Sequence, residues 1–314
     1  MAKIGQAIHA PPSTSSLSVE AKIANNHEVD LGNHDVSICI PPGAVIHDDK
    51  GEITLTLLRE LPGVELHEDE SVACYGIRCD PPNTVFVKPV KIRIPHSSVV
   101  INPNQVKPDI VSRVWDSVKD LPRTSRQRSS NSSDEPPYCR VYERHLELYI
   151  GHCAEWWVLI TLEQQVIRQK LMCTPYIPDK IDRGDEFAVN LQMYNDLPGT
   201  EVILREEAEQ QLYHKCHRSV PFSVETRSGD VTVTCQRDGE EVESQVFSAR
   251  NLQTNMNQCV VLYVPPRADD VDFTVITITI AQSGKHGISR SIAFVIRYRP
   301  KGNVFLMLSL SLCQ

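Results

Sequence analysis

Apolar and polar residues alternate with a period of two along most of this chain. Such alternation puts apolar side chains on one face of a strand and polar side chains on the other. It predicts strands at residues 36–40, 53–57, 88–95, 146–150, 187–193, 231–235, 276–280 and 292–298. Residues 156–162 are apolar on both faces, apart from Thr161, which is typical of a strand between two packed layers. The chain is therefore predicted to be mainly β.

Only residues 201–217 resemble a helix, with Val202, Leu204 and Leu212 set among Glu, Gln and Arg. The apolar stripe is imperfect, so a strand followed by a short helical turn is the alternative. Many short strands with Pro, Gly and Asp turns favour an all-β fold of two tandem β-sandwich-like domains with few short helices. The predicted parts are a flexible leader (1–27), a first domain (28–165) with a mobile polar loop (120–137), a second domain (166–299) and a C-terminal tail (300–314).

A proline pair marks the end of the first strand. Pro41 and Pro42 remove two backbone donors, so the strand must stop at Ile40. Gly43 can adopt a positive φ and turn the chain before Ala44. We expect these four turn residues to have a structural role.

This segment resembles the start of the ZU5 domain of ankyrins, zonula occludens proteins and Unc-five-type netrin receptors. The resemblance rests on the sequence IPPGA at 40–44 and on the strand EITLTL at 52–57. It implies a protein that binds and positions other proteins, and no enzymatic activity or cofactor.

The second half resembles the UPA domain, which follows a ZU5 domain in netrin receptors, the death-domain protein PIDD and ankyrins. The matching segments are residues 170–177, 201–207, 220–223 and 229–233. Together the two resemblances cover residues 28 to 299. They imply an intracellular signalling scaffold with a contact between its two domains that can be made or released. They also imply a death-domain-type or cytoskeletal partner, as in apoptosis or in spectrin binding by ankyrins.

Some members of this family cleave themselves at a His-Phe-Ser motif, where the Ser hydroxyl attacks the preceding carbonyl. The matching residues here are His152, Cys153 and Ala154. Ala154 has no nucleophile, and the Cys153 thiol would have to cut a different bond, the one before itself. We therefore expect no catalytic residue, with a buried Cys in a plain strand. The alternative is a self-cleaving signalling module that uses Cys153.

Other motifs for chemistry are weak. His214, Lys215, Cys216 and His217 form a cluster without a second ligand pair, and the separation of Cys74 from Cys79 does not fit a zinc site. We expect a solvated turn and no metal. The glycines are spread singly without a phosphate-binding loop, so nucleotide chemistry is not expected. A tandem β-sandwich that binds a small ligand or carbohydrate is a third interpretation.

Charge and composition narrow the partners and the compartment. The net charge of −8 and the absence of a basic stripe argue against nucleic acid as a partner. Residues 1–18 lack the apolar core of a secretory signal, and the apolar run at 304–312 is too short to span a bilayer. We expect a cytoplasmic protein, or one at the cytoplasmic face of a membrane in a longer form. Its ten cysteines are then expected to be reduced, with Cys39, Cys235 and Cys259 as small buried residues.

The chain also carries one acidic and one basic cluster of residues. Acidic residues gather at Glu65, Glu68, Asp69 and Glu70, and the polar loop carries Arg123, Arg126 and Arg128. Such clusters are usually solvated surface. The functional alternative is that the loop is a docking or phosphorylation segment.

Overall fold

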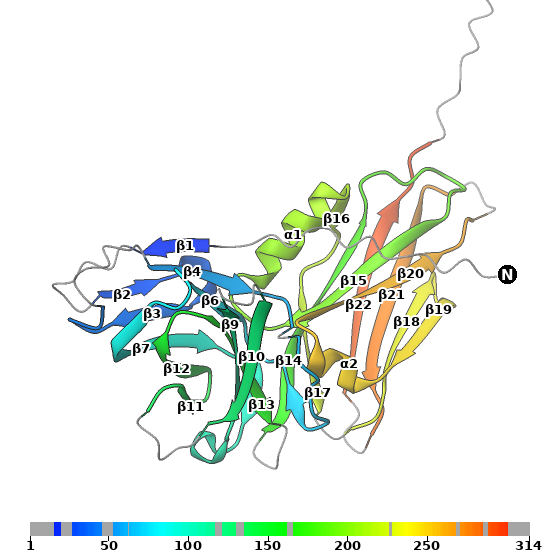
Figure 1. Cartoon of the computed structure of the whole chain (residues 1–314). Coiled ribbons are helices and arrows are strands. Elements are labelled where there is room, and N and C mark those ends of the chain that lie inside the picture. Colours follow the sequence, from blue (N-terminus) through cyan, green and yellow to red (C-terminus); the bar gives the residue numbers. More distant parts are fainter. Residues whose placement is uncertain are drawn as a thin grey trace, which may run out of the picture.

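The computed structural model describes residues 16–19, 27–45, 53–61, 63–116, 121–129, 135–161, 166–225, 228–267, 271–284 and 288–300. Strands and two helices form two lobes side by side (Figure 1). We call residues 16–161 the N-terminal lobe and residues 166–300 the C-terminal lobe. Most of the predicted leader and residues 301–314 of the predicted tail lie outside the described residues.

The N-terminal lobe holds two antiparallel sheets. One has the order β1 (Ser16–Val19), β4 (Ile53–Leu58), β6 (Gly76–Asp80), β13 (Glu155–Thr161), β9 (Asp109–Asp116) and β10 (Leu121–Arg128), with β5 (Glu70–Ser71) beside β13. The other has the order β11 (Tyr138–Val141), β12 (His145–His152), β7 (Val85–Pro95), β3 (Ser37–Ile40) and β2 (His27–Asp30). Two short 3-10 turns, η1 (Gly32–His34) and η2 (Pro103–Gln105), lie between strands.

The predicted alternation accounts for the core of this lobe. Ile38, Leu55, Ile92 and Leu148 are each fully buried, and their neighbours on the opposite face are more exposed in β7 and β12. Residues 156–161 of β13 are all buried, as their unbroken apolar character predicts. Burial of apolar side chains from both sheets is the main force that holds the lobe together.

The C-terminal lobe also holds two antiparallel sheets. One has the order β16 (Tyr213–Lys215), β14 (Val166–Pro178), β15 (Phe187–Asn195) and β20 (Asn257–Val264), and both β17 (Val220–Glu225) and β8 (Ser98–Val100) pair with β14. The other has the order β19 (Glu240–Phe247), β18 (Val231–Arg237), β21 (Phe273–Gln282) and β22 (Ser289–Arg297). The helices are α1 (Thr200–Gln210) and α2 (Ala249–Thr254). The prediction of an all-β fold with sandwich-like sheets and few short helices is confirmed.

In the strands of the C-terminal lobe, buried side chains also alternate with more exposed ones. Val189, Val233, Ile278 and Ile292 are fully buried, one from each of four strands in the two sheets. Two apolar residues of this lobe, Leu197 and Met256, instead pack into the core of the N-terminal lobe. Apolar contacts between these two residues and the N-terminal core therefore help to join the lobes.

Two strands lie where the sequence predicts irregular chain. β1 lies within the predicted leader and pairs with β4, and β10 lies within the predicted loop 120–137 and pairs with all of β9. The loop prediction is therefore wrong for residues 121–128, and the leader prediction is wrong for residues 16–19. β10 is an edge strand, which needs backbone partners on one side only and can carry polar side chains, so its apolar alternation is weak. β1 alternates, but its four residues are too few to predict a strand.

The helices also differ from the prediction. The segment 201–217 divides into α1, which ends at Gln210, and β16, so the structure has a helix followed by a strand. Leu212 between them adopts a left-handed conformation with φ of 62°. α2 was not predicted because it is short, and its start depends on the Ser248 hydroxyl, which accepts a hydrogen bond from the Arg250 backbone N–H. Among the described residues, no helix is long and apolar enough to cross a membrane.

Candidate functional site: the joint between the lobes

Backbone pairing joins the two lobes. Strand β8 of the N-terminal lobe pairs with β14 of the C-terminal lobe, with Ser98 opposite Gln169. The Lys170 N–H donates to the carbonyl of Ser97 at 2.8 Å, and the Ser97 N–H donates to the carbonyl of Ala73 at 2.9 Å. A sheet of the C-terminal lobe therefore continues into the N-terminal lobe.

A buried polar network lies beside this pairing. The Asn195 side chain accepts from Gln169 Nε2 at 2.5 Å and from Ser97 Oγ at 3.2 Å, and its Nδ2 donates to the carbonyl of Val72 at 2.8 Å. The Ser71 hydroxyl lies 2.7 Å from Gln169 Oε1. All four side chains are at most 1% exposed. Because water cannot replace a lost partner here, each of these bonds is costly to break.

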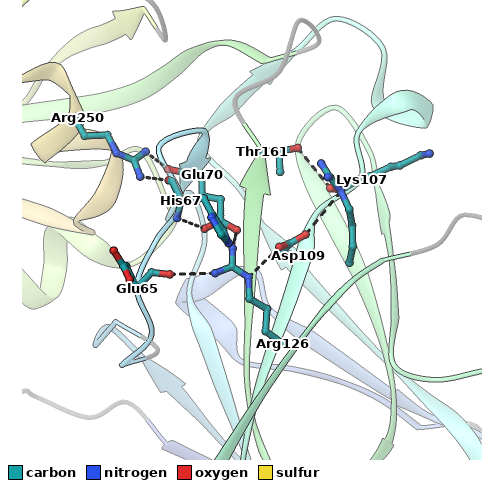
Figure 2. Close-up of polar contacts among 9 residues, drawn as sticks. Glu65, His67, Glu70, Lys107, Asp109, Arg126, Thr161 and Arg250 are labelled. Carbon is teal, nitrogen blue, oxygen red and sulfur yellow. Dashed lines mark hydrogen bonds and ion pairs between the residues drawn. The ribbon is translucent and has the colours of Figure 1, made fainter.

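A charged cluster extends the joint toward solvent (Figure 2). Arg126 of β10 donates through Nε to Asp109 Oδ2 at 3.0 Å, through Nη1 to the Glu65 carbonyl at 3.0 Å, and through Nη2 to the carboxylate of Glu70. From the C-terminal lobe, Arg250 of α2 donates to the backbone carbonyls of Glu70 and His67. One arginine thus orders the acidic loop from within its lobe, and a second binds that loop across the joint.

Burial sets the electrostatics of this cluster. The Glu70 side chain is 1% exposed, and its other oxygen accepts from the His67 N–H at 2.7 Å. Burial lowers the pKa of Arg126 and raises the pKa of Asp109, although the positive charge of Arg128 opposes the latter shift. The prediction of solvated surface is therefore wrong for the buried Glu70 and the partly buried Arg126, and removal of Arg126 would leave the buried Glu70 carboxylate without its ion-pair partner.

A third set of contacts lies at the start of α1. The Tyr75 hydroxyl lies 2.5 Å from Thr200 Oγ1 and donates to the carbonyl of Pro198 at 3.0 Å. The His34 ring packs edge-on against Tyr75, with ring centroids 5.7 Å apart, and burial lowers the pKa of His34. Arg59 and Glu207 form an ion pair at 2.6 Å on the same side of the joint.

The proline turn lies in the N-terminal lobe. β3 ends at Ile40 and Gly43 has a φ of 69°, as the sequence predicts. The Ala44 N–H donates to the carbonyl of Pro41 at 3.0 Å, and Lys88 Nζ donates to the carbonyl of Pro42 at 2.6 Å. These bonds hold the turn against β7.

His152, Cys153 and Ala154, which the sequence resemblance aligns with a His-Phe-Ser motif, lie where β12 connects to β13. His152 ends β12, and the ring of His152 lies 5.1 Å from that of Trp156. Cys153 and Ala154 are buried, and the sulfur of Cys153 is bonded to that of Cys79. The prediction of reduced cysteines is therefore wrong for this pair. Their Cα atoms are 4.7 Å apart, within the usual range for a disulfide, because the Cys79 N–H donates to the carbonyl of Ala154.

The remaining His and Cys residues that the sequence singles out do not come together at one site. His214 Nδ1 lies 3.1 Å from Asp179, while the thiol of Cys216 donates to the carbonyl of Pro175 at 3.4 Å. Burial raises the pKa of Cys74 to about 12, which keeps it a neutral thiol. Cys235 is buried, but Cys39 and Cys259 are only partly so, in contrast to the prediction. Over the described ranges, no group of three or more His, Cys, Asp or Glu side chains is placed to hold a metal ion.

Sequence reasoning missed the residues that join the lobes. Gln169, Asn195 and Arg250 stand in different strands and helices and form no local motif. Gln169 and Asn195 lie just outside the segments 170–177 and 187–193 in which the sequence shows a pattern, so the pattern gives no signal for them. Arg250 gives no signal either, because its partners are backbone carbonyls.

The comparisons with known proteins concern the N-terminal lobe. None of the curated proteins matches the chain. Residues 26–110, which contain the proline turn and strands β2 to β8, match the family model of the ZU5 domain, in general a protein-interaction module.

Proposed function

We propose that this chain is a non-enzymatic scaffold that binds other proteins in intracellular signalling, with its two lobes acting as one rigid docking unit. The ZU5 match supports docking by the N-terminal lobe. Rigid strands with exposed loops and edges are well suited to present shaped surfaces to a partner.

The observation that carries the proposal is the buried joint. Separating the lobes would break the hydrogen bonds of Ser71 to Gln169, of Ser97 to Asn195 and of Asn195 to the Val72 carbonyl, as well as the pairing of β8 with β14. The sequence resemblance implies a contact that can be released as a switch. The joint favours a fixed arrangement instead, because opening it would break buried hydrogen bonds and bring Leu197 and Met256 out of the core of the N-terminal lobe.

The finer proposal rests on the resemblance of residues 170–233 to the UPA domain. By that resemblance, the C-terminal lobe is UPA-like, and the partner is of the death-domain or cytoskeletal type. The setting is the cytoplasm or the cytoplasmic face of a membrane.

Direct binding tests this function. The full chain is used as bait in cell extracts, and each captured protein is then purified and titrated against the full chain by calorimetry. We expect at least one partner that binds saturably with a fixed stoichiometry. Failure of every captured protein to bind the purified chain would contradict the proposal.

The self-cleaving alternative has a separate test. Cys153 is buried and bonded to Cys79, and Ala154 has no hydroxyl, so we expect no cleavage. The purified chain is incubated with and without a reducing agent and examined on a denaturing gel. A single band is expected in both lanes, and a pair of fragments that splits next to residue 152 would support the alternative. Cys153→Ala is the control that assigns any cleavage to the thiol.

A further inference from the structure

Two tyrosines face each other across small residues on the outer face of the sheet formed by β16, β14, β15 and β20. Tyr213 pairs with Pro178, and Ala188 pairs with Tyr263. Continuing the register of β14 and β15, in which Tyr176 pairs with Asn190, places Pro178 opposite Ala188. Directly paired residues point to the same face of a sheet, so the four form one row across four strands. We call the space between the two rings the tyrosine trough.

The row creates a depression because its ends are large and its middle is small. Neighbouring strands lie about 4.8 Å apart, so the backbones of Tyr213 and Tyr263 are separated by roughly 14 Å. Between them the structure has a cavity of about 290 Å³. This volume is at the lower limit for a small-molecule site and suits one long side chain with its flanking backbone.

The trough is closed at one end and charged at the other. Along β14, Tyr176 is two residues before Pro178 and only 1% exposed, and α1 packs against the neighbouring strands β15 and β16. At the open end, Lys180, Asp185 and Glu186 contribute to the lining. Two carboxylates against one ammonium make this end acidic, in a chain whose net charge is −8.

The exposure of Tyr263 indicates that the trough is accessible. This side chain is 63% exposed, although a tyrosine ring gains stability from burial. The faces of its ring and of the Tyr213 ring are electron-rich and attract a cation, and the carboxylates add to that attraction. A purely apolar ligand would desolvate the Glu186 carboxylate and offer it no hydrogen bond in return.

We propose that the tyrosine trough receives an arginine side chain from an extended segment of a partner protein. A planar guanidinium can stack on tyrosine faces while its N–H groups donate to a carboxylate, which a lysine ammonium cannot do in the same way. The inference rests on the proposed function as a docking module and adds the chemistry that one of its surfaces recognises.

The probe is an acetylated, amidated hexapeptide, Gly-Ser-Leu-Arg-Gly-Ser, titrated into the full chain and followed by amide NMR shifts. We expect shifts at Ala188, Tyr213 and Tyr263. We expect Tyr263→Ala to weaken binding about 5- to 30-fold, as the loss of a partly desolvated cation–π contact predicts. Glu186→Gln removes one charge without shortening the side chain and should weaken binding less.

The controls separate the trough from other exposed aromatic surface. Phe273 is 59% exposed on the other sheet of the same lobe, and Phe273→Ala should leave binding unchanged. The peptide with Gln in place of Arg should not bind. The proposal is overturned if no shifts occur, if the Gln peptide binds equally well, or if Tyr263→Ala binds like the wild type.

Failure of the trough assignment can be distinguished from failure of the proposed docking function. If a partner captured by the wild type binds Tyr263→Ala with the same affinity and the peptide does not bind, docking stands and the trough assignment fails. If the peptide binds at the trough but no partner is found, the assignment stands and the proposed function fails.

Discussion

Glu147 illustrates how the polar face of a strand can be ordered at the scale of one residue. Its carboxylate accepts hydrogen bonds from Tyr149 at 2.9 Å and Tyr142 at 3.1 Å, and it pairs with Lys91 at 3.3 Å. Burial acts to raise the pKa of Glu147, but the bonds from Tyr149 and Lys91 outweigh it, so the pKa is lowered. The sequence predicts only that this position lies on the solvent-facing side of β12.

We predict that Glu147→Gln loses stability in a pH-dependent way. Because the folded-state pKa is below that of the unfolded chain, the carboxylate stabilises the fold above the unfolded value, and this contribution is lost as the pH falls through the folded-state pKa. The variant should be less stable by about 1 kcal/mol at pH 7. Urea denaturation at pH 7, 5 and 3 measures the difference, which should shrink at the lowest pH. Glu143→Gln, at an exposed position, is the control; an equal loss there would contradict the prediction.

Charged residues show where sequence reasoning is limited. Glu70 and Arg126 stand 56 positions apart, and each belongs to a local cluster that looks solvated in the sequence. Only the pairing of β10 with β9 brings Arg126 next to Asp109 and turns it toward Glu70. A side chain's environment depends on the register of its strand, which composition does not encode.

At the scale of elements, the period of two predicted the strands that bury an apolar face. β7, β12, β15, β18, β21 and β22 all follow from it. β10 did not, because an edge strand of largely polar residues is stabilised by its backbone bonds rather than by apolar burial. β1 does alternate, but over only four residues, which is too short a stretch to predict a strand. The bond between Cys79 and Cys153 also escaped prediction, since it joins residues 74 positions apart that only the sheet brings together.

We predict that Gly199→Ala destabilises the chain by about 3 kcal/mol. Gly199 precedes α1 with a φ of 81°, and a Cβ at this position would overlap the ring of His34 across the joint. Gly239 has a φ of 90° but faces open space, so Gly239→Ala carries only the backbone cost of about 1 kcal/mol. The difference between the free energies of unfolding of the two variants gives the cost of the overlap with His34, apart from the cost of the backbone conformation. Equal losses would show that His34 moves aside without cost.

At the scale of the whole molecule, the joint decides whether the lobes behave as one unit. It combines a shared sheet, a buried amide network and the pairing of Arg250 with carbonyls of the other lobe. Leu197 and Met256 add apolar contacts to the opposite core. Interfaces between domains of one chain are commonly more polar and more easily opened. Here the lobes are expected to unfold together.

The three tryptophans allow a direct test, because Trp115, Trp156 and Trp157 all belong to the N-terminal lobe. Their fluorescence reports that lobe alone, whereas far-UV circular dichroism reports the strands of both. In guanidinium the two signals should change together in the wild type, as a two-state transition requires. Asn195→Ala removes the acceptor of Gln169 Nε2 and Ser97 Oγ and the donor to the Val72 carbonyl. The loss should cost about 2–4 kcal/mol, so the two transitions of this variant should separate.

Asn190→Ala is the matched control for this experiment, since Asn190 lies on the same strand but only half-buried on its outer face. Its two transitions should coincide and keep the wild-type midpoint, because a substitution outside a buried network usually changes stability little. If the wild-type signals already separate, the lobes are independent despite the joint. If Asn195→Ala behaves like Asn190→Ala, the buried amide network does not couple them, and the shared sheet and apolar contacts must do so alone.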